Sequence, residues 1–127
     1  MKRVLICTSD KDTRRSLKII LDVLQCVVVQ TTNAETALQL LEDNQDFDLL
    51  ITSMKLPGTD GKELIKLLRK CGPFGQIPVI VTSGPVKLNV VEELLELGAA
   101  YFIPEPVKSE PATQYISRVL FGAAKAA

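Results

Sequence analysis

The chain has 127 residues, 46% of them apolar, and its 15 basic and 15 acidic side chains give a formal net charge of zero. This length and apolar content predict one domain with its own core, and the balanced charge argues against nucleic acid or an anionic membrane as the partner. No stretch approaches the ~20 apolar residues of a membrane span, and the amino terminus turns polar too soon for a signal peptide, so we expect a cytoplasmic protein.

Cysteine and histidine usage limits the chemistry that the chain can perform. The three cysteines, Cys7, Cys26 and Cys71, are widely separated and form no CxxC pair. This spacing predicts buried, reduced thiols in place of a disulfide framework or a zinc site. The chain contains no histidine, which removes the commonest metal ligand and general base.

Short apolar runs alternate with amphipathic patterns along the whole chain. Apolar runs are typical of buried parallel strands, and apolar residues spaced by three and four are typical of the helices that cover them. In chain order, this predicts a strand at 4–7, a helix at 12–24, a strand at 27–31, a helix at 33–43, a strand at 49–52, a helix at 62–70, a strand at 77–82, a helix at 88–97, a strand at 99–103 and a helix from 109 onward.

The alternation of strands and helices predicts an α/β fold. Asp12 or Thr13 is predicted to cap the first helix, and Asn33 the second. Five strands that alternate with five helices indicate a parallel sheet with helices on both faces, in the flavodoxin-like order 2-1-3-4-5. We assign residues 1–121 to this domain and expect residues 122–127 to form a frayed tail.

Hydroxyl side chains follow three of the predicted strands. Ser53 follows the third strand, Thr8 and Ser9 follow the first, and Ser83 follows the fourth. Because ligands of open parallel sheets bind beyond the carboxyl ends of the strands, these residues are expected to line one crevice.

Three motifs point to a known family. They are MKLPGTDGKELIKLLR after the third predicted strand, IPVIVTSG at the fourth and ELGAAYFIPEP at the fifth. With these motifs in this order, the whole chain resembles the receiver domain of two-component response regulators, the CheY-like superfamily. The resemblance implies a site of three carboxylates that bind Mg²⁺. One of them is the aspartate that accepts a phosphoryl group, and a hydroxyl and a lysine bind the phosphoryl oxygens.

The functional groups of that site are mostly absent from this chain. In the family the acceptor aspartate lies four residues before the loop proline, here Pro57, which selects Ser53. The other family positions fall on Thr8 and Ser9 for the acidic pair, Ser83 for the switch hydroxyl, Phe102 for the switch aromatic and Glu105 for the lysine. The resemblance therefore implies a degenerate pseudo-receiver that lacks the phosphoacceptor aspartate.

These replacements are expected to abolish aspartyl phosphorylation. A serine hydroxyl is a weak nucleophile without an adjacent base, and neutral oxygens compensate poorly for the hydration shell of Mg²⁺. We therefore expect no enzyme activity, no bound metal and no cofactor. Glu105 is expected to accept hydrogen bonds from serine or threonine hydroxyls and to repel a phosphoryl group. The Glu105–Pro106 bond stands where the family often has a cis peptide.

The leading functional hypothesis is a two-component signalling module that acts by protein–protein contact without phosphorylation. The resemblance implies a docking face built by the fourth helix, the fifth strand and the fifth helix, with Glu93, Tyr101 and Gln114 as candidate contact residues. The partner would be another signalling protein or a second copy of the chain, and neither nucleic acid nor a membrane is expected.

Two other functions remain open at this stage. In the first, hydroxyls and helix amino termini at the crevice bind a phosphate, a nucleotide or a flavin, as in a flavodoxin-like protein. In the second, a separate kinase phosphorylates Ser53 and restores regulation by another route. A purely structural interpretation is that Thr8, Ser9 and Ser53 satisfy backbone groups at the strand ends and that Phe102 packs in the core.

Overall fold

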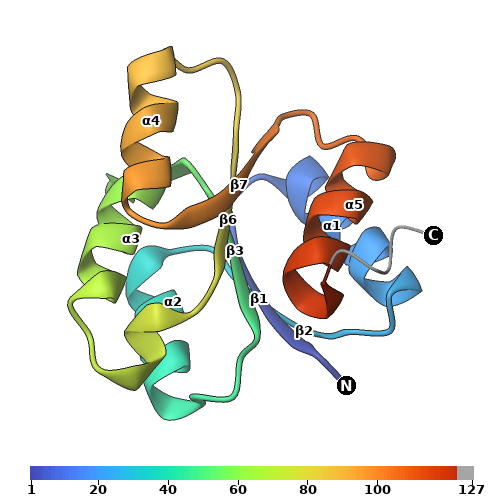
Figure 1. Cartoon of the computed structure of the whole chain (residues 1–127), viewed down its shortest axis with the longest axis horizontal. Helices are drawn as coiled ribbons and strands as arrows, with labels where there is room; N and C mark the ends of the chain where they lie inside the picture. The colour runs from blue at the N-terminus through green and yellow to red at the C-terminus, as the bar shows by residue number, and fades with distance from the viewer. Residues whose placement is uncertain (123–127) are drawn as a thin grey trace.

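The computed structural model describes residues 1–122 and contains a five-stranded parallel sheet between two helical layers (Figure 1). The strand order is β2-β1-β3-β6-β7, which confirms the predicted order 2-1-3-4-5. The strands are β1 (Arg3–Cys7), β2 (Val27–Thr31), β3 (Leu49–Ser53), β6 (Val79–Ser83) and β7 (Ala99–Pro104).

Helices cover both faces of this sheet, as the sequence predicts. In Figure 1, α2, α3 and α4 lie on one side of the sheet, and α1 and α5 lie on the other. The helices are α1 (Lys11–Val23), α2 (Ala34–Asp43), α3 (Gly61–Arg69), α4 (Leu88–Glu96) and α5 (Ser109–Phe121). Among residues 1–122, no helix combines the length and apolarity needed to cross a membrane.

Alternation along each strand divides the core into two halves. Leu5 and Cys7 of β1 pack in the cluster with α2, α3 and α4, whereas Val4 and Ile6 pack in the cluster with α1 and α5. Successive side chains of a strand point to opposite faces, so a strand covered on both faces must be apolar throughout. This explains why the strands appear in the sequence as continuous apolar runs.

The cap of α1 differs from the prediction. Asp10, and neither Asp12 nor Thr13, occupies the N-cap position, and its carboxylate accepts a hydrogen bond from the Thr13 backbone N–H at 3.0 Å. The helix begins at Lys11, one residue earlier than predicted. Thr13 is therefore a residue of the first turn, and its backbone N–H donates to the cap and does not belong to the cap residue. The cap of α2 at Asn33 is confirmed.

The loop after β3 contains a small hairpin that the sequence did not predict. Strands β4 (Lys55–Leu56) and β5 (Thr59–Asp60) pair antiparallel, and Gly58 between them has a positive φ of 73°. Gly61 then passes so close to β3 that a Cβ atom would lie 2.6 Å from the Ser53 carbonyl oxygen. Only glycine fits there, and this close approach holds the start of α3 against the end of β3.

Two further predictions are settled in part. Cys7 and Cys26 are buried as predicted, but Cys71 is partly exposed because it follows the end of α3 in the segment that leads to the 3₁₀ helix η1 (Pro73–Gln76). In the predicted tail, Gly122 ends α5 with a positive φ of 86°, and residues 123–127 lie outside the described residues.

Candidate functional site

Three neighbouring strands bring hydroxyl side chains together at the carboxyl edge of the sheet. The register pairs Ser53 of β3 with Thr82 of β6. It also pairs Cys7, the last residue of β1, with Thr52, so Thr8 directly after β1 lies beside Ser53. The Ser53 hydroxyl donates to Thr8 Oγ1 at 2.6 Å and lies 3.3 Å from Thr82 Oγ1. Thr8, Ser53 and Thr82 therefore form a buried row across the sheet.

Residue alternation explains this row. Thr8, Ser53 and Thr82 each follow, by two positions, an isoleucine that packs in the cluster with α1 and α5. Side chains two positions apart in a strand point to the same face, so the three hydroxyls share that face. Ser83 follows Thr82 and points to the opposite face. The residue of β6 that contacts Ser53 is therefore Thr82 and not Ser83. The sequence reasoning missed Thr82.

Glu105 extends the row beyond β7. The Thr82 hydroxyl donates to Glu105 Oε2 at 2.9 Å, and the Glu105 backbone N–H donates to the Ser83 carbonyl oxygen at 2.7 Å. The contact agrees with the expectation that Glu105 accepts a hydrogen bond from a serine or threonine hydroxyl, and the donor is Thr82. The peptide bond between Glu105 and Pro106 is cis.

The protons of two hydroxyls in the row, those of Ser53 and Thr82, can be assigned. A hydroxyl has one proton to donate, and Ser53 gives its proton to Thr8 while Thr82 gives its proton to Glu105. Thr8 Oγ1 also accepts the Asp10 backbone N–H at 3.1 Å. No base therefore accepts the Ser53 proton directly, since the carboxylate of Glu105 is one hydroxyl further along the row.

The remaining predicted site residues lie around this row. Ser9 is exposed, and Ser83 is buried on the other face of β6. Phe102 is partly buried and packs against the core cluster of α2, α3 and α4. Asp10 is exposed, and hydrogen bonds from the hydroxyl and then the backbone N–H of Thr13 lower the pKa of its carboxyl group.

A cleft of about 450 Å³ opens beside Glu105 at the same edge. Its lining carries mixed charge, because Lys55 contributes an ammonium group while Asp60 and Glu105 contribute carboxylates. Ser83 lines the cleft, but Thr8 and Ser53 do not. Within residues 1–122, no group of three or more His, Cys, Asp or Glu side chains could hold a metal ion.

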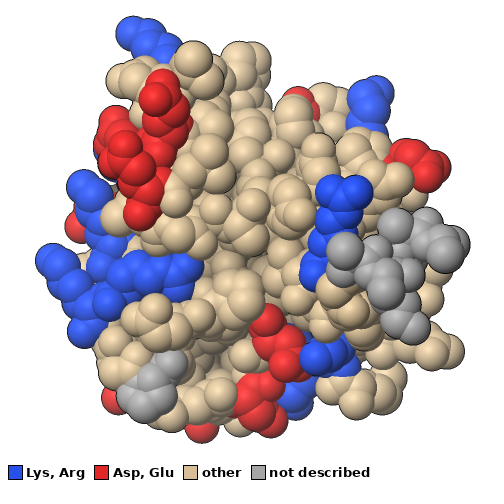
Figure 2. Space-filling view, viewed as in Figure 1, with Lys and Arg blue, Asp and Glu red and all other residues tan. Residues whose placement is uncertain are grey.

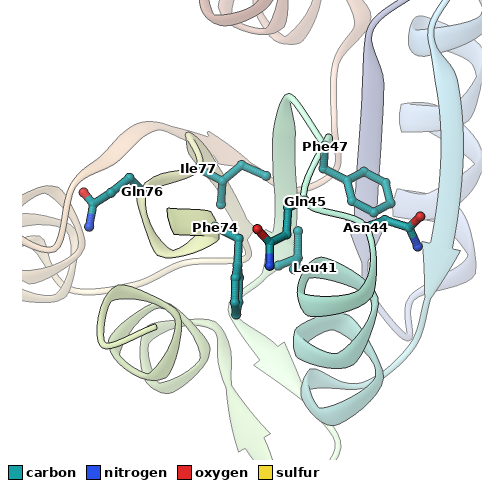
Figure 3. A pocket seen from close by; sticks show the side chains of 7 residues that line it. All are labelled: Leu41, Asn44, Gln45, Phe47, Phe74, Gln76 and Ile77. Atoms are coloured by element: carbon teal, nitrogen blue, oxygen red, sulfur yellow. The ribbon is translucent and has the colours of Figure 1, made fainter. Parts of the chain in front are cut away.

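A second cavity, of about 200 Å³, lies at the opposite edge of the sheet (Figure 3). Phe47 precedes β3 and Ile77 precedes β6, so this cavity is remote from the row of hydroxyls. Figure 3 shows Gln76 pointing away from Gln45 and Phe74. A ligand site needs polar groups that converge on one point, and this cavity lacks that convergence among its described side chains.

Comparison with known proteins identifies the family. Residues 4–117 match the family model described as the response regulator receiver domain. The chain belongs to this family. The receiver domain is also 34% identical over 109 residues to the two-component response regulator ARR10 of Arabidopsis thaliana. A second relative, the two-component response regulator ARR5 of the same plant, is 32% identical over 106 residues.

Length separates this receiver domain from those relatives. The ARR10 alignment covers 85% of the chain but 19% of the relative, and the ARR5 alignment covers 75% of the chain and 58% of the relative. Among solved structures, a CheY-like receiver domain protein from Methanospirillum hungatei JF-1 aligns with a TM-score of 0.84 and 28% identity. That alignment covers 100% of this chain and 99% of the other. Receiver domains are signalling modules of two-component systems that interact with other signalling proteins.

The receiver domain places the candidate contact residues in different environments. Glu93 of α4 pairs with Lys62 of α3 at 2.6 Å, and the hydrogen bond from Lys62 lowers the pKa of the glutamate. The Tyr101 ring of β7 stacks on the Tyr115 ring of α5, with centroids 4.5 Å apart. Gln114 is exposed on α5. Glu93 is therefore directed toward α3, while Tyr101 and Gln114 belong to the β7–α5 surface.

Proposed function

We propose that this receiver domain is a pseudo-receiver that signals by protein–protein contact without aspartyl phosphorylation. The observation that carries the proposal is the hydrogen bond from Ser53 to Thr8 at 2.6 Å. By motif, Ser53 corresponds to the phosphoacceptor and Thr8 to one of the acidic positions. Two neutral hydroxyls therefore bond to each other where the family's reaction needs carboxylates.

The chemistry of Ser53 supports this proposal. An aspartate is an anionic nucleophile at neutral pH, but a serine must lose its proton to a base. The Ser53 proton lies on a hydrogen bond to Thr8, and the nearest carboxylate in the row, that of Glu105, accepts from Thr82 instead. We accordingly propose that the domain has no enzymatic activity of its own.

The charges at the site also argue against Mg²⁺ and phosphate. Mg²⁺ dehydrates reluctantly and is usually held through carboxylates, whereas Thr8 and Ser53 are neutral. Asp10 directs its carboxylate to the amino terminus of α1. Glu105, at the position of the family's lysine, would repel a phosphoryl group where the lysine attracts one. We therefore propose a domain without a metal or a cofactor.

Two other functions have less support. Ser53 is 4% exposed, so a serine kinase would reach its hydroxyl only after the end of β3 opened. A phosphate, nucleotide or flavin in the cleft would bring its phosphate group close to the carboxylates of Asp60 and Glu105, which repel it.

The proposed docking surface is the face formed by α4, β7 and α5. Tyr101 and Gln114 lie on β7 and α5 of this face, and the stacking of Tyr101 on Tyr115 gives it an ordered aromatic feature. Aromatic side chains of this kind are enriched at protein interfaces. The proposed partner is another signalling protein or a second copy of the chain, in the cytoplasm.

Incubation with radiolabelled acetyl phosphate and Mg²⁺ tests the loss of phosphorylation. The unmodified chain is expected to take up no label, whereas the variant Thr8→Asp/Ser9→Asp/Ser53→Asp/Glu105→Lys, which restores the family's groups, is expected to gain label that hydroxylamine releases. Circular dichroism would establish that the variant is folded. Uptake of label by the unmodified chain would overturn the proposal, whatever the variant does.

A further inference from the structure

The exposed charges of α3 and α4 are segregated by sign. Figure 2 shows acidic side chains gathered over α4 and basic side chains gathered next to them over α3. Lys66 and Lys70 are exposed at α3, and Glu92 and Glu96 are exposed on α4. Among residues 1–122, none of these four side chains belongs to an ion pair. The face therefore presents an unpaired basic strip beside an unpaired acidic strip.

Two contacts fix the relative level of the two helices. Lys62 pairs with Glu93 at 2.6 Å, and the Arg69 Nε donates to the Leu97 carbonyl oxygen at 3.0 Å. One helical turn is about four residues, so Lys66 lies about one turn beyond Lys62 and between the two contacts. It is therefore level with the last turn of α4, between Glu93 and Leu97. The pKa of Glu93 is lowered mainly by the hydrogen bond from Lys62 and also by the charge of Lys66, which places that charge near α4.

We propose that a second copy of this chain docks on the α3–α4 face. The two-fold axis of this dimer runs parallel to α3 and α4, midway between them, and so places α3 of each copy over α4 of the other. Each residue then faces residues of the partner that lie at the same height along the axis. Lys66 of one copy then meets Glu96 of its partner, and the symmetric contact repeats the pair.

The charge pattern favours a second copy over another partner. A basic protein would match α4 alone, and an acidic protein would match α3 alone. The partner that matches both strips must carry both signs at the spacing of these helices, as the chain itself does. The net charge of zero also means that two copies do not repel each other at long range. This interface goes beyond the proposed function: it shares α4 with the proposed docking face but uses α3 in place of β7 and α5.

Complementary charge reversal provides the test. Sedimentation velocity of the unmodified chain is expected to show a dimer that weakens as the salt concentration rises. Glu92→Lys/Glu96→Lys alone and Lys66→Glu/Lys70→Glu alone are each expected to raise the dimer Kd about tenfold or more, because every cross-pair becomes repulsive. An equimolar mixture of the two variants is expected to dimerise again, because each basic strip then faces an acidic one.

Two controls accompany the mixture. Glu42→Lys/Glu110→Lys makes the same change in net charge as Glu92→Lys/Glu96→Lys but away from the face, and it is expected to leave the Kd unchanged. Tyr101→Ala/Gln114→Ala changes the β7–α5 surface, and its dimer is expected to form normally. An unmodified chain that stays monomeric up to about 1 mM, or a mixture that stays monomeric, would overturn the inference without bearing on aspartyl phosphorylation.

Discussion

The Thr82 hydroxyl donates to the Glu105 carboxylate at 2.9 Å and so joins β6 to the segment beyond β7. The backbone of the same segment is fixed by the bond from the Glu105 N–H to the Ser83 carbonyl oxygen. Both bonds lie where β6 leads into the loop before α4 and where β7 leads into α5. Glu105 therefore connects two loops of the carboxyl edge through one side-chain and one backbone hydrogen bond.

Removing the Thr82 hydroxyl is expected to destabilise the fold. Thr82→Val keeps the shape of the side chain but leaves a partly buried carboxylate without its donor, which costs about 1–3 kcal/mol. Thr82→Ser retains the donor and is expected to lose less than half as much. Urea unfolding followed by circular dichroism measures both changes. Equal losses in the two variants would contradict a role for the hydrogen bond.

The sequence contained a signal for this row of hydroxyls, but not enough to select its members. A Thr-Ser dipeptide ends β3 and β6, at Thr52-Ser53 and Thr82-Ser83, and another, Thr8-Ser9, directly follows β1. One residue of each dipeptide points to each face of the sheet, and only the register between strands decides which hydroxyls meet. Motif matching selected Thr8 and Ser53 of this row, and on the fourth strand it selected Ser83, which lines the cleft beside Glu105.

Local signals limited the other predictions in the same way. The strand order follows from the alternation of strands and helices, because right-handed crossovers leave few arrangements. The β4–β5 hairpin is followed by the close approach of Gly61 to the Ser53 carbonyl oxygen, which is a contact between segments that no local pattern encodes. The cap at Asp10 was missed because Asp12 and Thr13, which follow shortly after it, are also residue types that cap helices.

The pH dependence of stability is expected to reveal the cap at Asp10. Hydrogen bonds from Thr13 hold the pKa of this carboxyl group below its ordinary value of 3.8 in the folded state. The contribution of Asp10 is therefore complete above the unfolded-state pKa and is lost as the pH falls through the folded-state pKa. Asp10→Ala is expected to cost about 1 kcal/mol at neutral pH.

Asp10→Asn is the matched control for this prediction. Asparagine caps helices as well as aspartate does but does not titrate, so the variant is expected to be nearly as stable as the unmodified chain at neutral pH. Its stability should fall less between about pH 5 and pH 2 than that of the unmodified chain. Urea titrations across this range give the comparison, and identical slopes for both proteins would refute the assignment.

The three thiols are expected to differ in reactivity. Burial raises the pKa of Cys7 to about 11, and burial together with Asp48 raises the pKa of Cys26. The thiolate is the reactive form, so iodoacetamide at about pH 8 should label the partly exposed Cys71 first. Mass spectrometry of the native protein is expected to show one fast modification, which Cys71→Ser removes. Rapid labelling of Cys7 without denaturant would contradict the packing of β1.

Arg69 is expected to be one of the most sensitive positions outside the site. Its guanidinium donates to backbone carbonyls of the α4 end and of the η1 region at 2.7–3.2 Å, and these are the carbonyls of Leu97, Gly98, Gly75 and Ile77. Arg69→Met is expected to lose about 2–4 kcal/mol, because several partly buried carbonyls lose a charged donor together. Arg69→Lys should recover less than half, since an ammonium lacks the planar spread of donors.

The exposed Arg118 of α5 supplies the control for this loss. Arg118→Met removes the same charge and side-chain length from the surface and is expected to change the free energy of unfolding by less than about 0.5 kcal/mol. If urea unfolding gave similar losses of unfolding free energy for Arg69→Met and Arg118→Met, the hydrogen bonds of Arg69 to the backbone carbonyls would not stabilise the fold.

The pairing of a neutral residue at position 53 with an acid at position 105 can be tested directly. Ser53→Asp places a carboxylate in the buried row beside Thr8, with the Glu105 carboxylate one hydroxyl away, and is expected to cost about 2–4 kcal/mol. Glu105→Lys alone is also expected to destabilise the fold, because its ammonium would meet neutral hydroxyls. In the double variant the two new charges attract, so its loss should be smaller than the sum of the single losses by about 1–3 kcal/mol. Urea unfolding of all four proteins measures this coupling, and additive losses would mean that the side chains at positions 53 and 105 do not interact.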